Sequence, residues 1–262
     1  AGLVKDFKLR HAPKAKRLLR AVDGVDLAVH KGECLALVGE SGSGKSTVAK
    51  LILGLEKPTA GTVQLGSDKP IQPDRSRRQA KAACRNLQVV FQDPYASLDP
   101  QFTVARTLAE PLVIFREGTA EQRRQRIAEL LDLVGLPEDI AGRYPSELSG
   151  GQRQRVAIAR ALALEPEVLI CDEAVSALDV LVQAQILETL SELRRRLGLS
   201  MLFITHDLAV VAEIADTVAV INKGRIVESG PVPEVFAHPS DPYTEELLAA
   251  VPGQTLLHTQ HI

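Results

Sequence analysis

The sequence predicts an α/β fold in which a mostly parallel β-sheet is interrupted by a helical subdomain. Apolar runs with the length of buried strands alternate with helical segments toward both ends of the chain. Between them, residues 92–160 carry helical patterns. Alternation of this kind is typical of parallel strands joined by crossover helices, so we expect the all-helical stretch to be an insertion into the sheet domain.

The composition is that of an ordinary globular protein and argues against several classes. The 262 residues are 45% hydrophobic, enough to bury the core of one large domain or of a domain with a subdomain. The net charge of −2 provides no overall basic field for nucleic acid or anionic lipid. Three cysteines far apart in sequence predict neither a disulfide framework nor a metal site, and no apolar run approaches the ~18 residues that span a bilayer. We therefore expect a soluble, cytosolic protein.

The first 38 residues predict three short strands, and we expect the N-terminal ones to form an antiparallel β-subdomain. The strands cover Leu3–Leu9, Ala21–Val29 and Glu33–Val38. A helix over 45–54 follows, and the stretch Lys57–Gly61 ends it. Thr62–Leu65 then has the pattern of another strand.

A glycine-rich loop directly follows the apolar run Cys34–Val38 and carries the strongest functional signal in the chain. It fits the pattern G-x-x-x-x-G-K-[ST] and consists of Gly39, Glu40, Ser41, Gly42, Ser43, Gly44, Lys45, Ser46 and Thr47. Glycines let successive backbone N–H groups turn toward phosphate oxygens, and the following helix adds its positive N-terminal end. We expect Lys45 to reach the β- and γ-phosphates and the Ser46 hydroxyl to ligate Mg²⁺. The loop thus predicts a P-loop NTPase core, the alternative being a glycine-rich turn with an exposed lysine.

Helices are expected after the strand Leu87–Gln92. Their patterns cover 103–115 and 120–134, and a third helix begins near Ser149 with Arg153–Leu164 as its body. Strand character returns at Val168–Glu173, a helix with one apolar face runs to Leu197, and the strand Met201–His206 follows.

Two acidic residues end the apolar strand that begins at Val168. Ligands of open α/β sheets bind at the carboxyl ends of strands, which is where Asp172 and Glu173 stand. We expect Asp172 to hold Mg²⁺ and Glu173 to polarise an attacking water, because positioning and charge stabilisation dominate phosphoryl transfer. The alternative is an ordinary strand end with two solvated acids.

A second anion site is predicted at the start of the third helix. Ser149 can cap that helix, while Gly150 and Gly151 leave its N-terminal N–H groups uncovered, with Gln152 next in sequence. One nucleotide cannot fill both this site and the phosphate loop if the two lie far apart. Two chains face to face would solve the problem, each loop holding a nucleotide that the other chain's Ser149 helix closes.

These segments occur in the order found in the nucleotide-binding subunits of ABC transporters, which the chain resembles over almost its whole length. The segments are Gly39–Thr47, Gln92, Leu148–Gln152, Val168–Glu173, Ser176–Asp179 and His206. The resemblance implies a RecA-like core. It implies that Gln92 senses the γ-phosphate or Mg²⁺ and couples to the membrane subunit, that Asp179 lies at the dimer face and that His206 contacts the γ-phosphate.

The resemblance also implies partners and a location. It implies transmembrane permease subunits, a second identical or paralogous ATPase subunit and, indirectly, a solute-binding protein, but no nucleic acid. The subunit would bind two ATP at a head-to-tail dimer interface, as a peripheral protein at the cytoplasmic face of the membrane. The expected limits are residues 1–91 with 161–230 for the ATP-binding core, 92–160 for the helical subdomain and 231–262 for a C-terminal tail.

A finer resemblance indicates one group of importers within this family. The stretches Gln92–Pro100, Val175–Gln185 and His238–Thr244 are similar to importers of peptides and nickel, and within them to the second of two paralogous ATPases. Ala174 stands where many relatives carry proline, and the cysteine-rich extension of many peptide importers is absent from this sequence. The rival hypotheses are a soluble, non-transport ABC ATPase and a small-molecule P-loop kinase.

Adenine recognition has one candidate. Members of the resembled family stack the base on an aromatic ring before the phosphate loop, and Phe7 is the only aromatic residue before Gly39. A core phenylalanine is the alternative. His258 and His261 could bind metal, although residues at a chain end are more often disordered.

Overall fold

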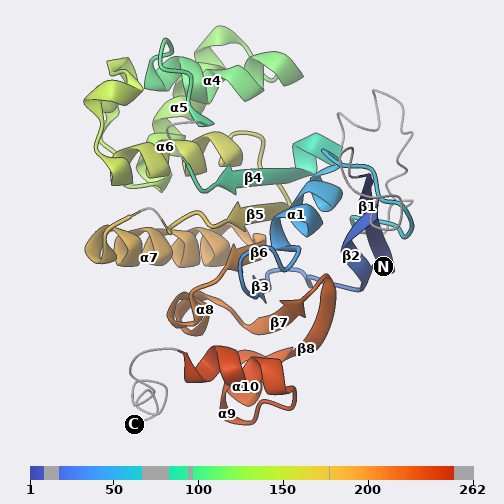
Figure 1. The fold of residues 1–262 in the computed structure, drawn as a ribbon. Coiled ribbons are helices and arrows are strands. Elements are labelled where there is room, and N and C mark those ends of the chain that lie inside the picture. Colours follow the sequence, from blue (N-terminus) through green and yellow to red (C-terminus); the bar gives the residue numbers. More distant parts are fainter. Residues whose placement is uncertain (9–17, 67–82, 94–96, 177, 251–262) are drawn as a thin grey trace. The chain divides into compact units, whose positions relative to one another are not determined.

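The computed structural model describes residues 1–8, 18–66, 83–93, 97–176 and 178–250. The chain divides into two compact units, one of Ala1–Ala83 with Leu202–Ile262 and one of Cys84–Met201. The hydrogen-bonded strand order of the larger sheet is β4-β5-β6-β3-β7-β8, and β6, Ser200–Thr205, contains the division between the units. Figure 1 shows the elements of each unit.

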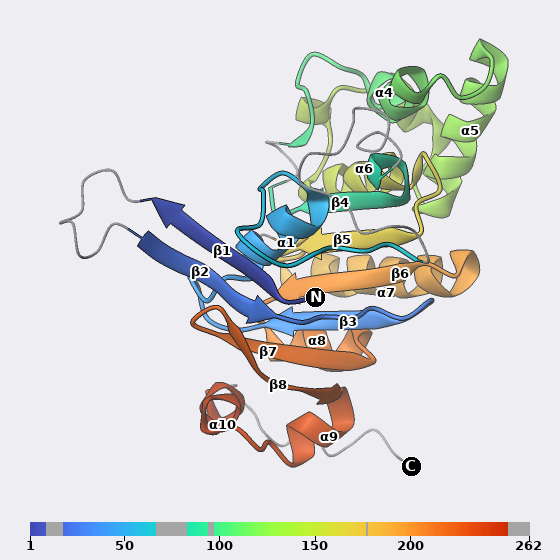
Figure 2. The ribbon, with the colours of Figure 1, turned by 90° about the vertical axis from the view of Figure 1, so that its right-hand side faces the viewer.

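The first unit contains an antiparallel strand pair and part of the larger sheet. β1, Leu3–Lys8, pairs antiparallel with β2, Leu18–Val25 (Figure 2). In the larger sheet, β3 pairs parallel with β7, and β7 pairs antiparallel with β8. The ranges are β3 Cys34–Val38, β7 Thr217–Asn222 and β8 Arg225–Pro231, with the helices α1 Lys45–Leu53 and α8 Leu208–Ile214. The mostly parallel sheet and the antiparallel β-subdomain that the sequence predicts are both confirmed.

Two C-terminal helices, α9 (Val232–Ala237) and α10 (Pro242–Ala249), close the core of the first unit. One apolar cluster joins Ala36 and Val38 of β3 to Val235 of α9 and Leu248 of α10. All four side chains are buried, so β3 is fixed from the end of the chain as well as by its sheet neighbours. Burial of apolar surface stabilises such a cluster by about 25 cal/mol per Å².

The second unit combines α-helices with a parallel strand pair. β4, Leu87–Phe91, pairs with β5, Val168–Asp172, over the whole of both strands. The α-helices are α4 Val104–Phe115, α5 Ala120–Leu133, α6 Gly150–Leu162 and α7 Val180–Leu197, with short 3₁₀ turns at Glu138–Gly142 and Pro145–Glu147. The helices that the sequence predicts between 103 and 197 thus lie within this unit.

Local sequence explains where these helices begin. Thr103 accepts a hydrogen bond from the first turn of α4, and Thr119 with Gln122 forms a capping box at α5. Asp207 accepts hydrogen bonds from Ala209 N and Val210 N at α8. Polar side chains before each helix therefore satisfy backbone donors that the helix leaves unpaired.

Two strand predictions need correction. The second strand spans Leu18–Val25 instead of Ala21–Val29, because Leu18 and Leu19 pair with the last residues of β1 although their side chains are exposed. The stretch Thr62–Leu65 forms no strand and contributes a single bridge residue. The helix predicted over 45–54 ends one residue earlier, at Leu53, because Gly54 adopts a left-handed conformation.

Candidate functional site

The phosphate loop has a backbone that only glycine fits at two positions. Gly39 and Gly44 have φ of 155° and 115°. A Cβ on Gly39 would lie 2.2 Å from the carbonyl oxygen of Ile221, and one on Gly44 would lie 2.6 Å from that of Ala21. Gly42 also has a positive φ of 80°, but a Cβ there would meet nothing within 4 Å. The loop therefore packs closely on β7 and β2 at its two ends.

The side chain of Lys45 turns back over the loop. It is 5% exposed, and its Nζ donates hydrogen bonds to the carbonyl oxygens of Gly39 (2.6 Å) and Glu40 (2.9 Å). Gly44, the residue before α1, has no side chain with which to cap the helix. The N–H groups of the first turn of α1 thus provide the positive end of a helix dipole beside a lysine.

The turn between β7 and β8, late in the sequence, supports the phosphate loop. The N–H of Gly224, between β7 and β8, donates to the carbonyl oxygen of Ser43 (2.8 Å), and the N–H of Asp23 donates to the carbonyl oxygen of Gly224 (2.8 Å). A Cβ on Gly224 would lie 2.9 Å from the carbonyl oxygen of Ala21, so only glycine allows the approach. Residues far apart in the sequence therefore hold Ser43.

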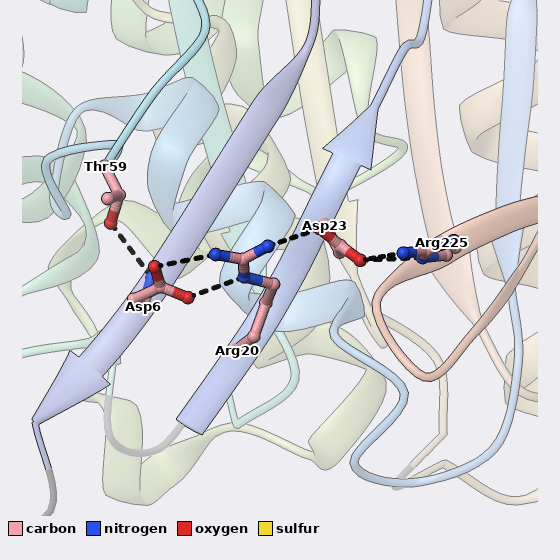
Figure 3. Close-up of polar contacts among 5 residues, drawn as sticks. All are labelled: Asp6, Arg20, Asp23, Thr59 and Arg225. Atoms are coloured by element: carbon pink, nitrogen blue, oxygen red, sulfur yellow. Dashed lines mark hydrogen bonds and ion pairs between the residues drawn. The ribbon is translucent and has the colours of Figure 1, made fainter. Parts of the chain in front are cut away.

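A chain of ion pairs fastens the same turn to β1 and β2 (Figure 3). Arg20 lies between Asp6 (2.9 Å) and Asp23 (3.1 Å), and Arg225 contacts Asp23 from the other side (2.5 Å). The hydrogen bond from Arg225, with a smaller contribution from Arg20, holds the pKa of Asp23 below its ordinary value. The two carboxylates raise the pKa of Arg20. Thr59 accepts a hydrogen bond from Asp6 N.

His206 and Phe7 belong to the same unit as the loop. His206 is exposed and follows β6, the neighbour of β3 in the sheet order. Phe7 is half-buried on β1 opposite Leu19, with Lys5 Nζ 4.8 Å from its ring centroid. Contact of His206 with a γ-phosphate and of Phe7 with adenine both stay predictions.

In the second unit, the predicted metal ligand Asp172, the predicted catalytic acid Glu173 and Gln92 lie at the same edge of the β4–β5 pair. β4 and β5 run in register with Phe91 opposite Asp172, and Gln92 and Glu173 are the residues that follow the two strands at this edge of the pair. Glu173 has a φ of 51°, an uncommon left-handed conformation for a residue with a side chain. Its carbonyl oxygen accepts hydrogen bonds from Ser176 N and Ser176 Oγ. Strained backbone of this kind is concentrated at functional sites.

The Ser149 helix begins with a capping box. Ser149 Oγ accepts from Gln152 N (3.2 Å), and Gln152 Oε1 accepts from Ser149 N (2.9 Å). A Cβ on Gly151 would lie 2.6 Å from Val182 Cγ1, whereas one on Gly150 would lie 3.7 Å from Leu178 Cδ2. The cap that the sequence predicts for Ser149 is therefore present, and Gly151 lets α6 approach the start of α7.

Asp179 caps α7 beside this junction. Its Oδ1 accepts a hydrogen bond from Val182 N (3.1 Å). The next two residues, Val180 and Leu181, are 81% and 78% exposed, which is unusual for adjacent aliphatic side chains. Asp179 therefore caps the same end of α7 that packs against the start of α6, and it lies next to an exposed apolar pair.

The described residues give two further results that bear on function. They contain no group of three or more histidine, cysteine, aspartate or glutamate side chains that could hold a metal ion. None of their helices is long and apolar enough to cross a membrane. The stretch Pro94–Ala96, Ala177 and the histidines at 258 and 261 lie outside the described residues.

Comparison with known proteins decides the family. The family model described as "ABC transporter" matches residues 22–176, more than half of the chain. The chain belongs to the ABC transporter family. Two relatives can be aligned with 95% of this chain. They are the oligopeptide transport ATP-binding protein OppF of Bacillus subtilis (46% identical, 81% of its length covered) and OppD of Mycobacterium tuberculosis (49% identical, 41% covered).

Solved ABC cassettes share the fold. A dimeric structure of the ATP-binding cassette MJ0796, in a post-hydrolysis state with ADP and Pi, is 31% identical with a TM-score of 0.76, covering 88% of this chain and 97% of that one. The structure of cbiO1 from Clostridium perfringens, part of the ABC transporter complex cbiONQ, is 30% identical with a TM-score of 0.76, covering 90% and 91%. The chain is thus an ATPase of the ABC family with a P-loop NTPase fold, and the resemblance inferred from its sequence is confirmed.

Sequence reasoning missed some contacts of this ABC ATPase. It assigned no role to Gly224, which supports Ser43, or to Tyr243, whose hydroxyl accepts a hydrogen bond from Glu40 N at 3.0 Å. The glycine after Lys223 is a signal from which a turn could have been predicted, but nothing in the sequence indicates what that turn contacts. Tyr243 stood in a stretch noted only for its resemblance to importers.

Proposed function

We propose that this ABC ATPase energises the uptake of peptides through a membrane permease. The observation that carries the proposal is the similarity over 95% of the chain to OppF and OppD, both named oligopeptide transport ATP-binding proteins. The resemblance in sequence pointed equally to nickel or metal chelates, and neither relative supports these substrates. A soluble, non-transport ABC ATPase is the less favoured alternative.

The phosphate loop, Gly39–Thr47, would bind the phosphates of ATP, with Lys45 on the β- and γ-phosphates. Its uncapped helix start and its closely packed glycines support this role. Glu173 would orient the attacking water, and its strained backbone at a strand end supports that assignment. His206 would contact the γ-phosphate, and Phe7 would stack on adenine.

Magnesium would accompany the nucleotide. The expected donors are the Ser46 hydroxyl, the Gln92 amide and the Asp172 carboxylate, and oxygen ligands of this kind fit the preference of Mg²⁺. Gln92 and Asp172 stand at the same edge of the β4–β5 pair, which supports their acting together. When bound, the ion would neutralise charge on the phosphates.

Two chains would share each ATP in a head-to-tail dimer. Residues 149–152 of one chain would close on the nucleotide held by the other chain's phosphate loop, with Asp179 at the dimer face. The dimeric MJ0796 structure and the exposed pair Val180 and Leu181 beside Asp179 support this arrangement. The partner chain would be identical or paralogous.

The assembly would sit peripherally at the cytoplasmic face of the membrane. Its partners would be transmembrane permease subunits and, indirectly, a solute-binding protein, but no nucleic acid. That cbiO1 is part of the transporter complex cbiONQ supports such an assembly. The core of residues 1–91 with 161–230, the helical subdomain 92–160 and the tail 231–262 remain our proposal for the functional domains.

The test is peptide-dependent ATP hydrolysis in a reconstituted membrane. The chain would be assembled in proteoliposomes with its cognate permease and solute-binding protein, and ATPase activity would be measured with peptides and with nickel. We expect stimulation by peptides, and its loss in Glu173→Gln while MgATP still binds, because general-base catalysis contributes about 10²–10⁴-fold. Stimulation by nickel alone would refute the peptide assignment.

A further inference from the structure

Tyr243 links the last helix of the first unit to the phosphate loop. It stands in α10, and its hydroxyl accepts a hydrogen bond of 3.0 Å from the backbone N–H of Glu40, 203 positions earlier in the chain. Glu40 is the second residue of the loop. An element outside the loop thus fixes the first peptide group after Gly39.

The same residue, Glu40, also contacts the side chain of Lys45. Its N–H donates to Tyr243, and its carbonyl oxygen accepts from Lys45 Nζ at 2.9 Å. Two hydrogen bonds therefore connect the tyrosine hydroxyl to the lysine ammonium through one backbone residue. A shift of Glu40 would move a partner of the ammonium that we expect on the β- and γ-phosphates.

Tyr243 is itself held in a defined position. Asp241 Oδ1 accepts a hydrogen bond from Tyr243 N (2.8 Å) and caps α10. Glu228 on β8 accepts hydrogen bonds from Ser240 N (2.8 Å), Ser240 Oγ (2.9 Å) and Asp241 N (3.2 Å). Figure 2 shows α10 beside β8. The approach to α10 is thus anchored to the sheet.

The ring and the hydroxyl of Tyr243 do different things. The ring packs, partly buried, against the cluster that contains Val38, the last residue before Gly39. A phenylalanine could fill that place equally well, whereas the hydroxyl alone reaches Glu40 N. Burial raises the pKa of Tyr243, so the phenol is neutral at physiological pH and keeps its proton.

We propose that Tyr243 is a positioning residue for ATP binding, which sets Glu40 and through it the Lys45 ammonium. The effect is on the loop before nucleotide arrives, because a preorganised site loses less conformational freedom on binding. The proposal rests on the ATP site of the phosphate loop and assigns a function to the stretch His238–Thr244.

The experiment compares Tyr243→Phe with Leu247→Ala in the full chain. Leu247 lies one turn later in α10 and packs against the same cluster, and its aliphatic side chain can make no hydrogen bond to the loop. Dissociation constants for MgATP and MgADP and the melting temperature without nucleotide would be measured for each protein. Tyr243→Phe should weaken binding of both nucleotides about 2- to 10-fold, the range that corresponds to one neutral hydrogen bond. Its melting temperature should fall only slightly, because Glu40 is exposed and its N–H can bond to water.

Leu247→Ala should show the opposite split, a lower melting temperature with nucleotide affinity unchanged, because it removes packing alone. Wild-type affinity in Tyr243→Phe would overturn the proposal. Equal losses of affinity and of melting temperature in both variants would also overturn it and assign Tyr243 to packing. A wild-type chain that bound no MgATP would instead refute the ATP site, so the two failures are distinguishable.

Discussion

The starts of α1 and α6 are both glycine-rich, yet their glycines do different work. Before α1, Gly39 and Gly44 adopt positive φ angles, and Gly44 leaves the helix without a side-chain cap. In α6, Gly150 and Gly151 have no positive φ, and Ser149 caps the helix. The first region leaves its helix start uncapped, as anion-binding helix starts do, whereas the second packs against α7.

The difference explains why only one of these helix starts would bind phosphate within its own chain. The capping box of α6 already uses the N–H groups of Ser149 and Gln152. In our proposal, the remaining first-turn donors bind phosphate that another chain presents. A site shared between two chains stays a prediction, and four experiments test this contrast between the two helix starts, in order of decreasing effect.

The largest effect is expected from mixing two inactive variants. Lys45→Ala disables the loop, and Ser149→Arg blocks the α6 start by size and charge while leaving the chain's own loop able to bind ATP. Each variant alone should lose ATPase activity. Mixed one to one, they should recover at most about a quarter of it, since half of randomly assorted dimers are mixed and each has one intact site of two.

The readout is ATPase activity against total protein concentration. If the native pair is a heterodimer, the paralogue should carry one of the two changes. If Ser149→Arg alone is active, and its activity does not depend on protein concentration, the shared site is contradicted. A single chain would then form the whole ATP site.

The next effect separates the glycines of the loop. Gly39→Ala should lower the free energy of unfolding by about 3 kcal/mol, because its Cβ would lie 2.2 Å from a backbone oxygen that cannot move aside. Gly42→Ala is the matched control, since its Cβ meets nothing and only its positive φ is strained, at a cost of about 1 kcal/mol. Urea unfolding of both variants checks this, and equal losses would show that the packing against Ile221 is unimportant.

A third prediction concerns the packing of α6 on α7. Gly151→Ala should cost about 1–2 kcal/mol through contact with Val182, whereas Gly150→Ala should be neutral or stabilising because alanine favours helix. In a Val182→Ala background the cost of Gly151→Ala should fall, as a double-mutant cycle would show. If the losses of unfolding free energy are additive, contact with Val182 does not explain the glycine at position 151.

Sequence predicted those parts of the molecule whose cause is local. The loop follows from its own glycines and lysine, and the cap of α6 follows from Ser149 and Gln152, three residues apart. Apolar runs placed β3, β4 and β5 within a residue or two of their ends. Pairing of β4 with β5 in register brings the ends of the two strands, before Gln92 and Glu173, to the same edge.

The rest depends on partners that pattern alone does not identify. Gly224 and Tyr243 each contact the phosphate loop from about 180 and 200 residues away, and no periodicity links such positions. β2 was placed late because its first residues, Leu18 and Leu19, are exposed and are held by pairing with β1 instead of by burial. The left-handed backbone of Glu173 likewise reflects a turn closed by Ser176.

The smallest effect is expected from the ion pairs that fasten the β7–β8 turn behind the loop. Because the folded-state pKa of Asp23 is lowered, chiefly by Arg225, its contribution to stability is present above the pKa of the unfolded chain, about 3.9. The contribution is lost as pH falls from there through the lower folded-state value. Asp23→Asn should therefore be less stable than wild type at neutral pH, by an amount that shrinks below about pH 4.

Urea unfolding from pH 7 to pH 3 measures this difference in stability. The control is Glu192→Gln, which removes an exposed ion pair with Arg196 in α7 and should have little effect at pH 7. A gap between Asp23→Asn and wild type that stays constant down to pH 3 would show that the Asp23 carboxylate is not what holds the turn, leaving the support of Ser43 to the backbone of Gly224 alone.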